Sequence, residues 1–198
     1  VGKRTGVAAV RLAVDMVKEG LITKKEALQR IGPDQLAQYL YPIFDAQEES
    51  RCTPLGKGLP AGPGAAAGKL ALTADRAVEM KAAGNRVVLV RQETSPDDIH
   101  GMNAALGFLT ARGGMTSHAA VVARQMGKVC VAGCEAIEVL DSQSVRIGTQ
   151  VFREGEYLSV NGSTGNVYGG DIPVVESEVI QVLQGKMEAS ASEKYQLF

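Results

Sequence analysis

Residues 113–124, GGMTSHAAVVAR, combine side chains that phosphoryl chemistry needs. They set His118 behind a glycine pair and two hydroxyls, at the start of an apolar stretch. The first turn of a helix presents free N–H groups and the positive end of the helix dipole, so it attracts anions. A histidine at that place is suited to form a covalent phosphoryl intermediate through a ring nitrogen.

Five residues near His118 are candidates for binding the phosphoryl oxygens. They are Arg112, Gly113, Gly114, Thr116 and Ser117. The glycines let the backbone approach a phosphate, the hydroxyls and free N–H groups donate to it, and the arginine adds a charge-assisted contact. The attacking nitrogen must be unprotonated, and a helix N-terminus disfavours the imidazolium form. On these residues alone, the alternative is a histidine that only caps the helix or lies at the edge of the core.

An amphipathic helix over residues 117–126 is predicted to position this histidine, with Thr116 or Ser117 as its N-cap and Gly127 as its end. Its apolar residues recur at helical spacing: Ala119, Val122, Ala123 and Met126. Because His118 lies at the edge of that stripe, its ring can pack at its base and still expose one edge.

The middle of the chain alternates strand and helix patterns and then becomes mostly strand. The expected strands are 68–73, 86–91, 106–110, 129–132, 144–147, 150–153, 157–160 and 166–168, and the helices 74–83, 95–104 and 117–126. This order predicts an α/β fold, in which a layered sheet is covered by helices on one side.

Three segments are expected: a helical segment at 1–50, a central domain at 51–173 and a polar, partly helical tail at 174–198. Helical periodicity covers residues 5–19, a capping box at Thr23–Glu26 opens a second helix, and a short third helix follows Pro33. The glycines and prolines between Ser50 and Gly68 predict a linker and a structured loop.

Composition restricts the class of protein. Of the 198 residues 45% are hydrophobic and 22% charged, and the formal net charge is −1, which gives no argument for nucleic acid or membrane as a partner. Cys52, Cys130 and Cys134 are expected to be reduced thiols of an intracellular protein. The compartment, cytoplasm or an organelle matrix such as a plastid or glycosome, is only what the family resemblance described below implies. With two histidines and no tight cluster of ligating side chains, no metal site is expected in this chain.

Residues 113–124 resemble, at every position, the phosphohistidine motif of the phosphoenolpyruvate-utilising enzymes, Gly-Gly-x-Thr-Ser-His-Ala-Ala-Val-Val-Ala-Arg. Further stretches are similar to the pyruvate phosphate dikinase branch of that family: KRTG at 3–6, AVDMVKEG at 13–20, GLPA at 58–61, ETSPDD at 93–98, GKVCVAGC at 127–134, REGE at 153–156 and NGSTG at 161–165. Met115 fits that branch, because other branches carry arginine there, whereas Ala111 departs from the acidic residue expected before Arg112.

The resemblance implies a mobile, three-layer β/β/α swivelling domain in which His118 is the phosphohistidine. It implies that the histidine takes a pyrophosphoryl group from ATP, passes one phosphoryl group to inorganic phosphate and the other to pyruvate. The partners it implies are an ATP-grasp nucleotide-binding domain, which residues 1–45 would adjoin, and a C-terminal β/α barrel that binds pyruvate or phosphoenolpyruvate. The full-length enzyme is expected to be a homodimer with Mg²⁺ on those partner domains, and this chain alone is not expected to complete the reaction.

Thr116 carries a second implication of the resemblance. In plant enzymes of this kind, the threonine two residues before the histidine is reversibly phosphorylated, which switches the enzyme off. A phosphate at Thr116 would repel an incoming phosphoryl group. The alternative, which the sequence favours, is that Thr116 is only a cap and phosphate ligand.

Two other functions stay open. One is the equivalent domain of phosphoenolpyruvate synthase, which uses water where the dikinase uses phosphate. The other is a non-catalytic docking module in which His118 is dispensable. His100 is expected to be a surface or helix-end histidine, and Arg124 an ion-pairing or docking residue rather than a catalyst.

Overall fold

The structure, a computed structural model, describes residues 6–197 except for the side chains of Val7 and Asp34. The chain forms two compact units, one made of residues up to Pro42 together with those from Glu176 onward, and the other of residues 43–175. Most of the KRTG stretch at residues 3–6 lies outside the described residues.

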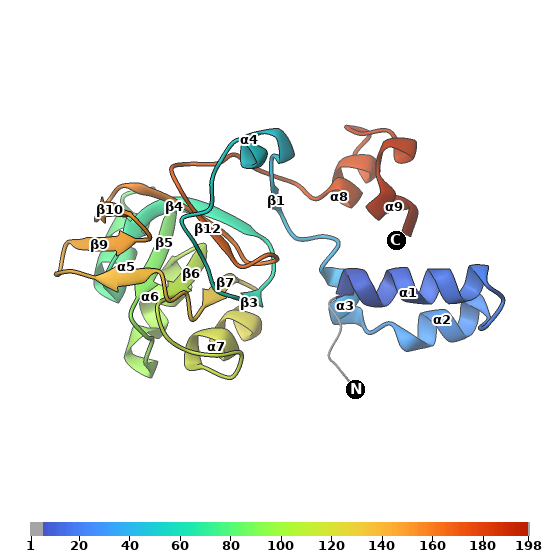
Figure 1. The fold of residues 1–198 in the computed structure, drawn as a ribbon, viewed down its shortest axis with the longest axis horizontal. Helices are drawn as coiled ribbons and strands as arrows, with labels where there is room; N and C mark the ends of the chain where they lie inside the picture. Colours follow the sequence, from blue (N-terminus) through green and yellow to red (C-terminus); the bar gives the residue numbers. More distant parts are fainter. Residues whose placement is uncertain (1–5, 198) are drawn as a thin grey trace. The chain divides into compact units, whose positions relative to one another are not determined.

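Eight strands form the large sheet of the 43–175 unit, in the order β2-β12-β11-β4-β5-β6-β7-β3. Among them, Figure 1 labels β3 to β7 and β12. They are β2 (Gly56–Lys57), β3 (Leu59–Gly62), β4 (Ala65–Ala71), β5 (Val87–Arg91), β6 (Gly107–Thr110), β7 (Val129–Ala132), β11 (Tyr157–Asn161) and β12 (Asn166–Gly169). Strands β4 to β7 are parallel and adjacent in chain order. The helices α5 (Ala74–Ala82), α6 (Ile99–Ala104, after the 3₁₀ turn η1, Pro96–Asp98) and α7 (His118–Met126) connect them. Right-handed connections of this kind place the helices on one face of the sheet.

Both faces of the parallel strands are covered. On one face, Leu89 and Phe108 pack with buried residues of α5, α6 and α7. On the other, Leu70 and Leu109 pack with Ile147 of a small antiparallel sheet, order β10-β9-β8. Its strands are β8 (Ile137–Val139), β9 (Ser144–Ile147) and β10 (Gln150–Arg153). The small sheet, the large sheet and the helices make the expected three-layer β/β/α fold, and the near-continuous apolar strands are those of a sheet buried on both faces.

The linker predicted between Ser50 and Gly68 is wrong, because β2, β3 and the start of β4 lie there. The glycines of this segment provide space rather than flexibility. A Cβ on Gly58 would lie 2.7 Å from the carbonyl oxygen of Ala132, and one on Gly62 would lie 2.3 Å from that of Lys128. Glycine therefore lets β3 pack closely along β7, and Pro60 is tolerated because β3 is the edge strand.

Several short elements have no counterpart in the sequence prediction: β1 (Ile43–Phe44), α4 (Ala46–Ser50), β8 and β13 (Val174–Val175). Strand β1 pairs antiparallel with β13, which brings together the two ends of the 43–175 unit. Helix α4 is fastened to the same unit, because the Asn161 side-chain amide and the Tyr168 hydroxyl donate to Glu49 Oε1 at 2.7 and 2.9 Å. The larger unit therefore includes residues before position 51.

The smaller unit is helical. It contains α1 (Gly6–Lys18), α2 (Lys24–Arg30), α3 (Pro33–Ala37), α8 (Glu178–Leu183), η2 (Ala189–Ala191) and α9 (Glu193–Leu197). The predicted capping box is confirmed, since Glu26 N donates to Thr23 Oγ1 at 3.2 Å and Thr23 N donates to Glu26 Oε2 at 2.7 Å. Val10, Tyr39 and Val179 form its core, so the two ends of the chain fold together.

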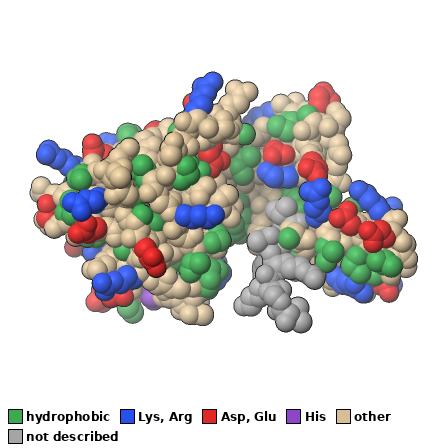
Figure 2. All heavy atoms as spheres, viewed as in Figure 1, with side chains coloured by type: hydrophobic (Ala, Val, Ile, Leu, Met, Phe, Trp, Pro, Cys, Tyr) green, Lys and Arg blue, Asp and Glu red, His purple; other side chains and the backbone are tan. Residues whose placement is uncertain are grey.

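Charges of both signs are interspersed over the face shown in Figure 2, in keeping with the formal net charge of −1. Among residues 6–197, no helix is both long enough and apolar enough to cross a membrane.

The three thiols are expected to differ in reactivity. Burial raises the pKa of Cys134 and raises that of Cys130 to about 12, so both stay protonated at pH 8, whereas the thiolate is the nucleophile. Cys52 is only half-buried. Iodoacetamide at pH 8 should therefore modify Cys52 in the folded protein and reach the other two only after unfolding in urea, which peptide mass spectrometry measures. Equally fast modification of Cys130 would contradict this burial.

Candidate functional site

His118 lies at the carboxyl-terminal edge of the parallel strands. Strand β6 ends at Thr110, and α7 begins at His118 itself. The first turns of α5 and η1 follow β4 and β5 at the same edge. In open α/β sheets this edge is where ligands bind, because loops and helix N-termini meet there.

Ser117 is the N-cap of α7, which settles the choice between Thr116 and Ser117. Its hydroxyl accepts a hydrogen bond from Ala120 N at 3.4 Å, and its own N–H donates to the Gly114 carbonyl at 3.0 Å. Several neighbouring backbone N–H groups have no acceptor among the described residues: those of Gly114, Met115, Thr116, His118 and Ala119. The loop and the helix start therefore present a row of free donors, as an anion requires.

The two glycines of the loop have different roles. Gly113 has φ +114°, and a Cβ there would lie 2.8 Å from Ser117 Cβ, so glycine is needed for the turn itself. Gly114 has ordinary φ, and a Cβ there would meet nothing within 4 Å. The chain's own packing therefore does not require glycine at position 114, and the space above it is open.

A glycine that the sequence reasoning did not single out supports this loop from β7. Gly133 has φ +63°, and a Cβ there would lie 2.3 Å from the Gly113 carbonyl oxygen. Gly133 N also donates to Thr110 Oγ1 at 3.3 Å. The loop before His118 thus rests on the backbone at the end of β7.

The His118 ring is half-buried, as the helical pattern predicts. Its Nε2 is enclosed and has no hydrogen-bond partner among the described residues. Arg112 and Thr116 are exposed, and the Arg112 backbone N–H donates to the Gln92 carbonyl at 2.8 Å.

Other features of the sequence lie away from this edge. The NGSTG turn begins at Asn161, which pairs with Ala65 at the start of β4 and thus lies at the opposite edge of the sheet. His100 bonds Asp75 at 2.9 Å on the surface, as expected. Among residues 6–197, no group of three or more His, Cys, Asp or Glu side chains is placed to hold a metal ion.

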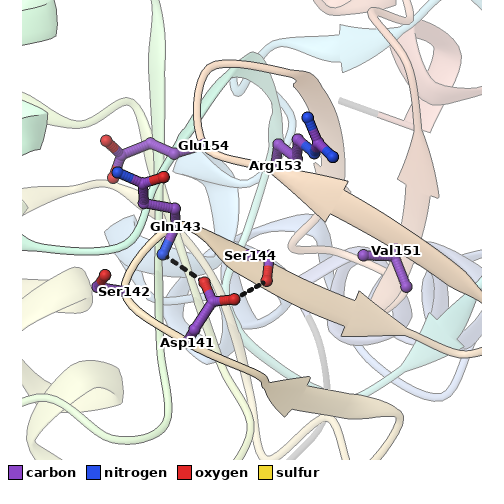
Figure 3. A pocket seen from close by; sticks show the side chains of 7 residues that line it. All are labelled: Asp141, Ser142, Gln143, Ser144, Val151, Arg153 and Glu154. Carbon is purple, nitrogen blue, oxygen red and sulfur yellow. Dashed lines mark hydrogen bonds between the residues drawn. The ribbon is translucent and has the colours of Figure 1, made fainter.

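An open cavity of about 720 Å³ lies over the small sheet and shares no residue with α7 or its preceding loop (Figure 3). The Asp141 carboxylate in it accepts hydrogen bonds from Gln143 N at 2.7 Å and from the Ser144 hydroxyl at 2.8 Å. These hydrogen bonds lower the pKa of Asp141, and the ionised carboxylate stabilises the turn between β8 and β9.

Comparison with known proteins identifies the class to which this fold and site belong. Residues 83–165 match the family described as "PEP-utilising enzyme, mobile domain", and this range contains β5, β6, α7 and the His118 loop. Residues 83–165 of the chain belong to that family.

Within the family, the similarity is to pyruvate, phosphate dikinases. The chain is 54% identical to pyruvate, phosphate dikinase 2 of Oryza sativa subsp. japonica over 87% of its length. It is 51% identical to pyruvate, phosphate dikinase of Clostridium symbiosum over 90% of the present chain, and 46% identical to the Giardia intestinalis enzyme over 99% of the present chain. It spans about a fifth of the length of these relatives, namely 20%, 20% and 22%.

Proposed function

We propose that this chain is the phosphocarrier part of a pyruvate, phosphate dikinase and that His118 is the residue phosphorylated. The observation that supports this most directly is the placement of His118 as the first residue of α7, beside free backbone donors and the Ser117 cap, inside the region that matches the mobile domain. The N–H groups and hydroxyls there would meet the charge that develops on the equatorial phosphoryl oxygens.

In the proposed reaction, an unprotonated ring nitrogen of His118 attacks the β-phosphorus of ATP, which breaks the bond to AMP and forms a P–N bond. Inorganic phosphate takes the terminal phosphoryl group and leaves as diphosphate. The enolate of pyruvate then attacks the remaining phosphorus, which breaks the P–N bond and gives phosphoenolpyruvate. Each transfer is balanced, and the histidine returns to its starting state.

The partners in this proposal are the ones that the family resemblance implies. They are an ATP-grasp nucleotide-binding domain and a barrel that binds pyruvate or phosphoenolpyruvate, in a homodimeric enzyme. Mg²⁺ would be bound on those domains, and no step assigned to this chain depends on a metal ligand of its own. The segments outside the 43–175 unit, up to Pro42 and from Glu176 onward, would connect the carrier to the two partners.

The experiment that tests the proposal supplies ³²P-labelled phosphoenolpyruvate to the full-length protein without nucleotide. We expect label that is lost in acid and stable in alkali, in the peptide that contains α7. Label that is stable in acid, or label in another peptide, would overturn the assignment. A full-length protein that forms phosphoenolpyruvate from ATP and pyruvate without added phosphate, with water accepting the terminal phosphoryl group, would instead favour the synthase.

Thr116 is proposed to bind the phosphoryl group through its hydroxyl and to be a possible regulatory phosphorylation site. We expect Thr116→Val to slow His118 labelling by about 10-fold, which is the value of one hydrogen bond to a charged group. Thr116→Glu should slow it more, because a carboxylate repels the incoming phosphoryl group and occupies the same donors. Rapid-quench labelling measures both rates. Equal labelling by Thr116→Glu and wild type would exclude control by charge at this position.

A further inference from the structure

Arg124 donates hydrogen bonds to two backbone carbonyls, one of which lies in the loop before His118. Its Nη2 donates to the carbonyl oxygen of Met115 at 2.7 Å, and its Nη1 lies 3.4 Å from the carbonyl oxygen of Ala61, to which it donates. Among the described residues it forms no ion pair, so the pairing expected from the sequence is not what holds it. A guanidinium binds two acceptors at once because its donors form a rigid planar fork.

The Met115 carbonyl lies in the loop between β6 and α7, three residues before His118. Arg124 is in the last turn of α7, and side chains of a helix lean toward its N-terminus, which lets the guanidinium reach back to that loop. A trans peptide unit is planar, with its N–H opposite its C=O. Fixing the Met115 carbonyl toward Arg124 therefore fixes the Thr116 N–H on the opposite side, where it has no acceptor among the described residues.

The second acceptor is supplied by an irregularity of β3. Pro60 pairs with Val131 and Gly62 with Cys130, so Ala61 is the extra residue of a bulge in the β3–β7 ladder. A bulge takes one residue out of the regular hydrogen-bond ladder and re-aims its backbone. The Ala61 carbonyl thereby becomes an anchor for Arg124, although Ala61 itself is buried.

We propose that Arg124 is a positioning residue of the phosphoryl site, which ties the loop of residues 113–117 to β3 and holds its N–H groups in the orientation that receives the phosphoryl group. The inference rests on the proposed function of His118. Arg124 touches neither the histidine ring nor the phosphoryl group in this role, and it acts through the peptide unit of Met115 and Thr116.

The test uses three variants of the full-length protein, Arg124→Gln, Arg124→Lys and the control Arg146→Gln. Arg146 is an exposed arginine of the small sheet and pairs with Glu138 at 2.7 Å, so the control removes an arginine contact from the same unit far from the loop. The first readout is the labelling rate of His118 at saturating phosphoenolpyruvate, at a temperature where every variant is folded. The second is amide hydrogen exchange of Ser117, whose N–H closes the loop on Gly114.

We expect Arg124→Gln to label about 10- to 100-fold more slowly, as small misplacements of a reacting group do, with an unchanged KM for phosphoenolpyruvate. Ser117 exchange should become about 10-fold faster, since the loop opens more readily. Arg124→Lys should be intermediate, because one ammonium group does not replace the fork, and Arg146→Gln should match wild type in both readouts.

Three results would overturn the inference. Arg124→Gln that labels at the wild-type rate would show that Arg124 only stabilises the fold, whatever its melting temperature. An Arg124→Lys variant that labels at the wild-type rate would show that a positive charge suffices. The simultaneous hydrogen bonds of Arg124 to the Met115 and Ala61 carbonyls would then not be needed. The third result is wild-type protein that takes no label although Ser117 exchange still becomes faster in Arg124→Gln. That result would overturn the proposed function of His118, and Arg124 would then position the loop without any role in phosphoryl transfer.

Discussion

His118→Gln is expected to abolish acid-labile labelling from phosphoenolpyruvate and to lower overall turnover by at least about 10⁴-fold, because the covalent route has no substitute nucleophile. Glutamine keeps a polar side chain of similar reach but has no nitrogen lone pair able to attack phosphorus. The fold should be retained, since the ring is only half-buried and no described residue bonds to Nε2.

The matched control is His100→Gln, which changes the other histidine of the chain. His100 is exposed and bonds only Asp75 among the described residues, so its loss should leave the labelling rate within about twofold, as exposed pairs contribute little. Rapid-quench labelling and circular dichroism of both variants provide the comparison. Acid-labile label that persists in His118→Gln would assign the carrier role to another residue. Turnover that persists in this variant with no label on the chain would favour the docking module.

Local signals in the sequence explain which elements were predicted correctly. The strands at 129–132, 144–147 and 150–153 match β7, β9 and β10, each bounded by turn residues. The helix predicted at 117–126 is observed from His118 to Met126, with Ser117 as its cap and Gly127 in the left-handed conformation at its end. Caps, stops and alternation are properties of neighbouring residues, so one sequence suffices to find them.

Long-range pairing explains what the sequence did not predict. The glycines and prolines of the 50–68 segment are typical of a linker, but here glycine is needed because β3 lies against the backbone of β7. The same limit applies at the site. His118 and Ser117 belong to one local motif, whereas Gly133 follows β7 and Ala61 lies in β3, and neither carries a chemical signature of its own. Only the positive φ of Gly133 and the bulge at Ala61 mark them, and both are visible in the backbone alone.

Gly133→Ala is expected to destabilise the 43–175 unit by about 2–4 kcal/mol, the sum of left-handed backbone strain and forced overpacking. The strain arises because Gly133 has φ +63°. The overpacking arises because a Cβ there would lie 2.3 Å from the carbonyl oxygen of Gly113, which is backbone and cannot turn aside as a side chain could. The contact therefore relaxes only if the loop before His118 moves.

Gly127→Ala separates these two contributions. Gly127 has nearly the same backbone conformation, φ +64°, but a Cβ there would meet nothing within 4 Å. Its substitution should cost only the strain, about 1 kcal/mol, with His118 labelling close to wild type. Thermal unfolding measures the stability of both variants, and the labelling rate of His118 measures the effect on the site. Because the Gly133 variant must displace the Gly113 carbonyl, it should lose labelling as well as stability, and equal behaviour of the two variants would show that the loop does not rest on β7.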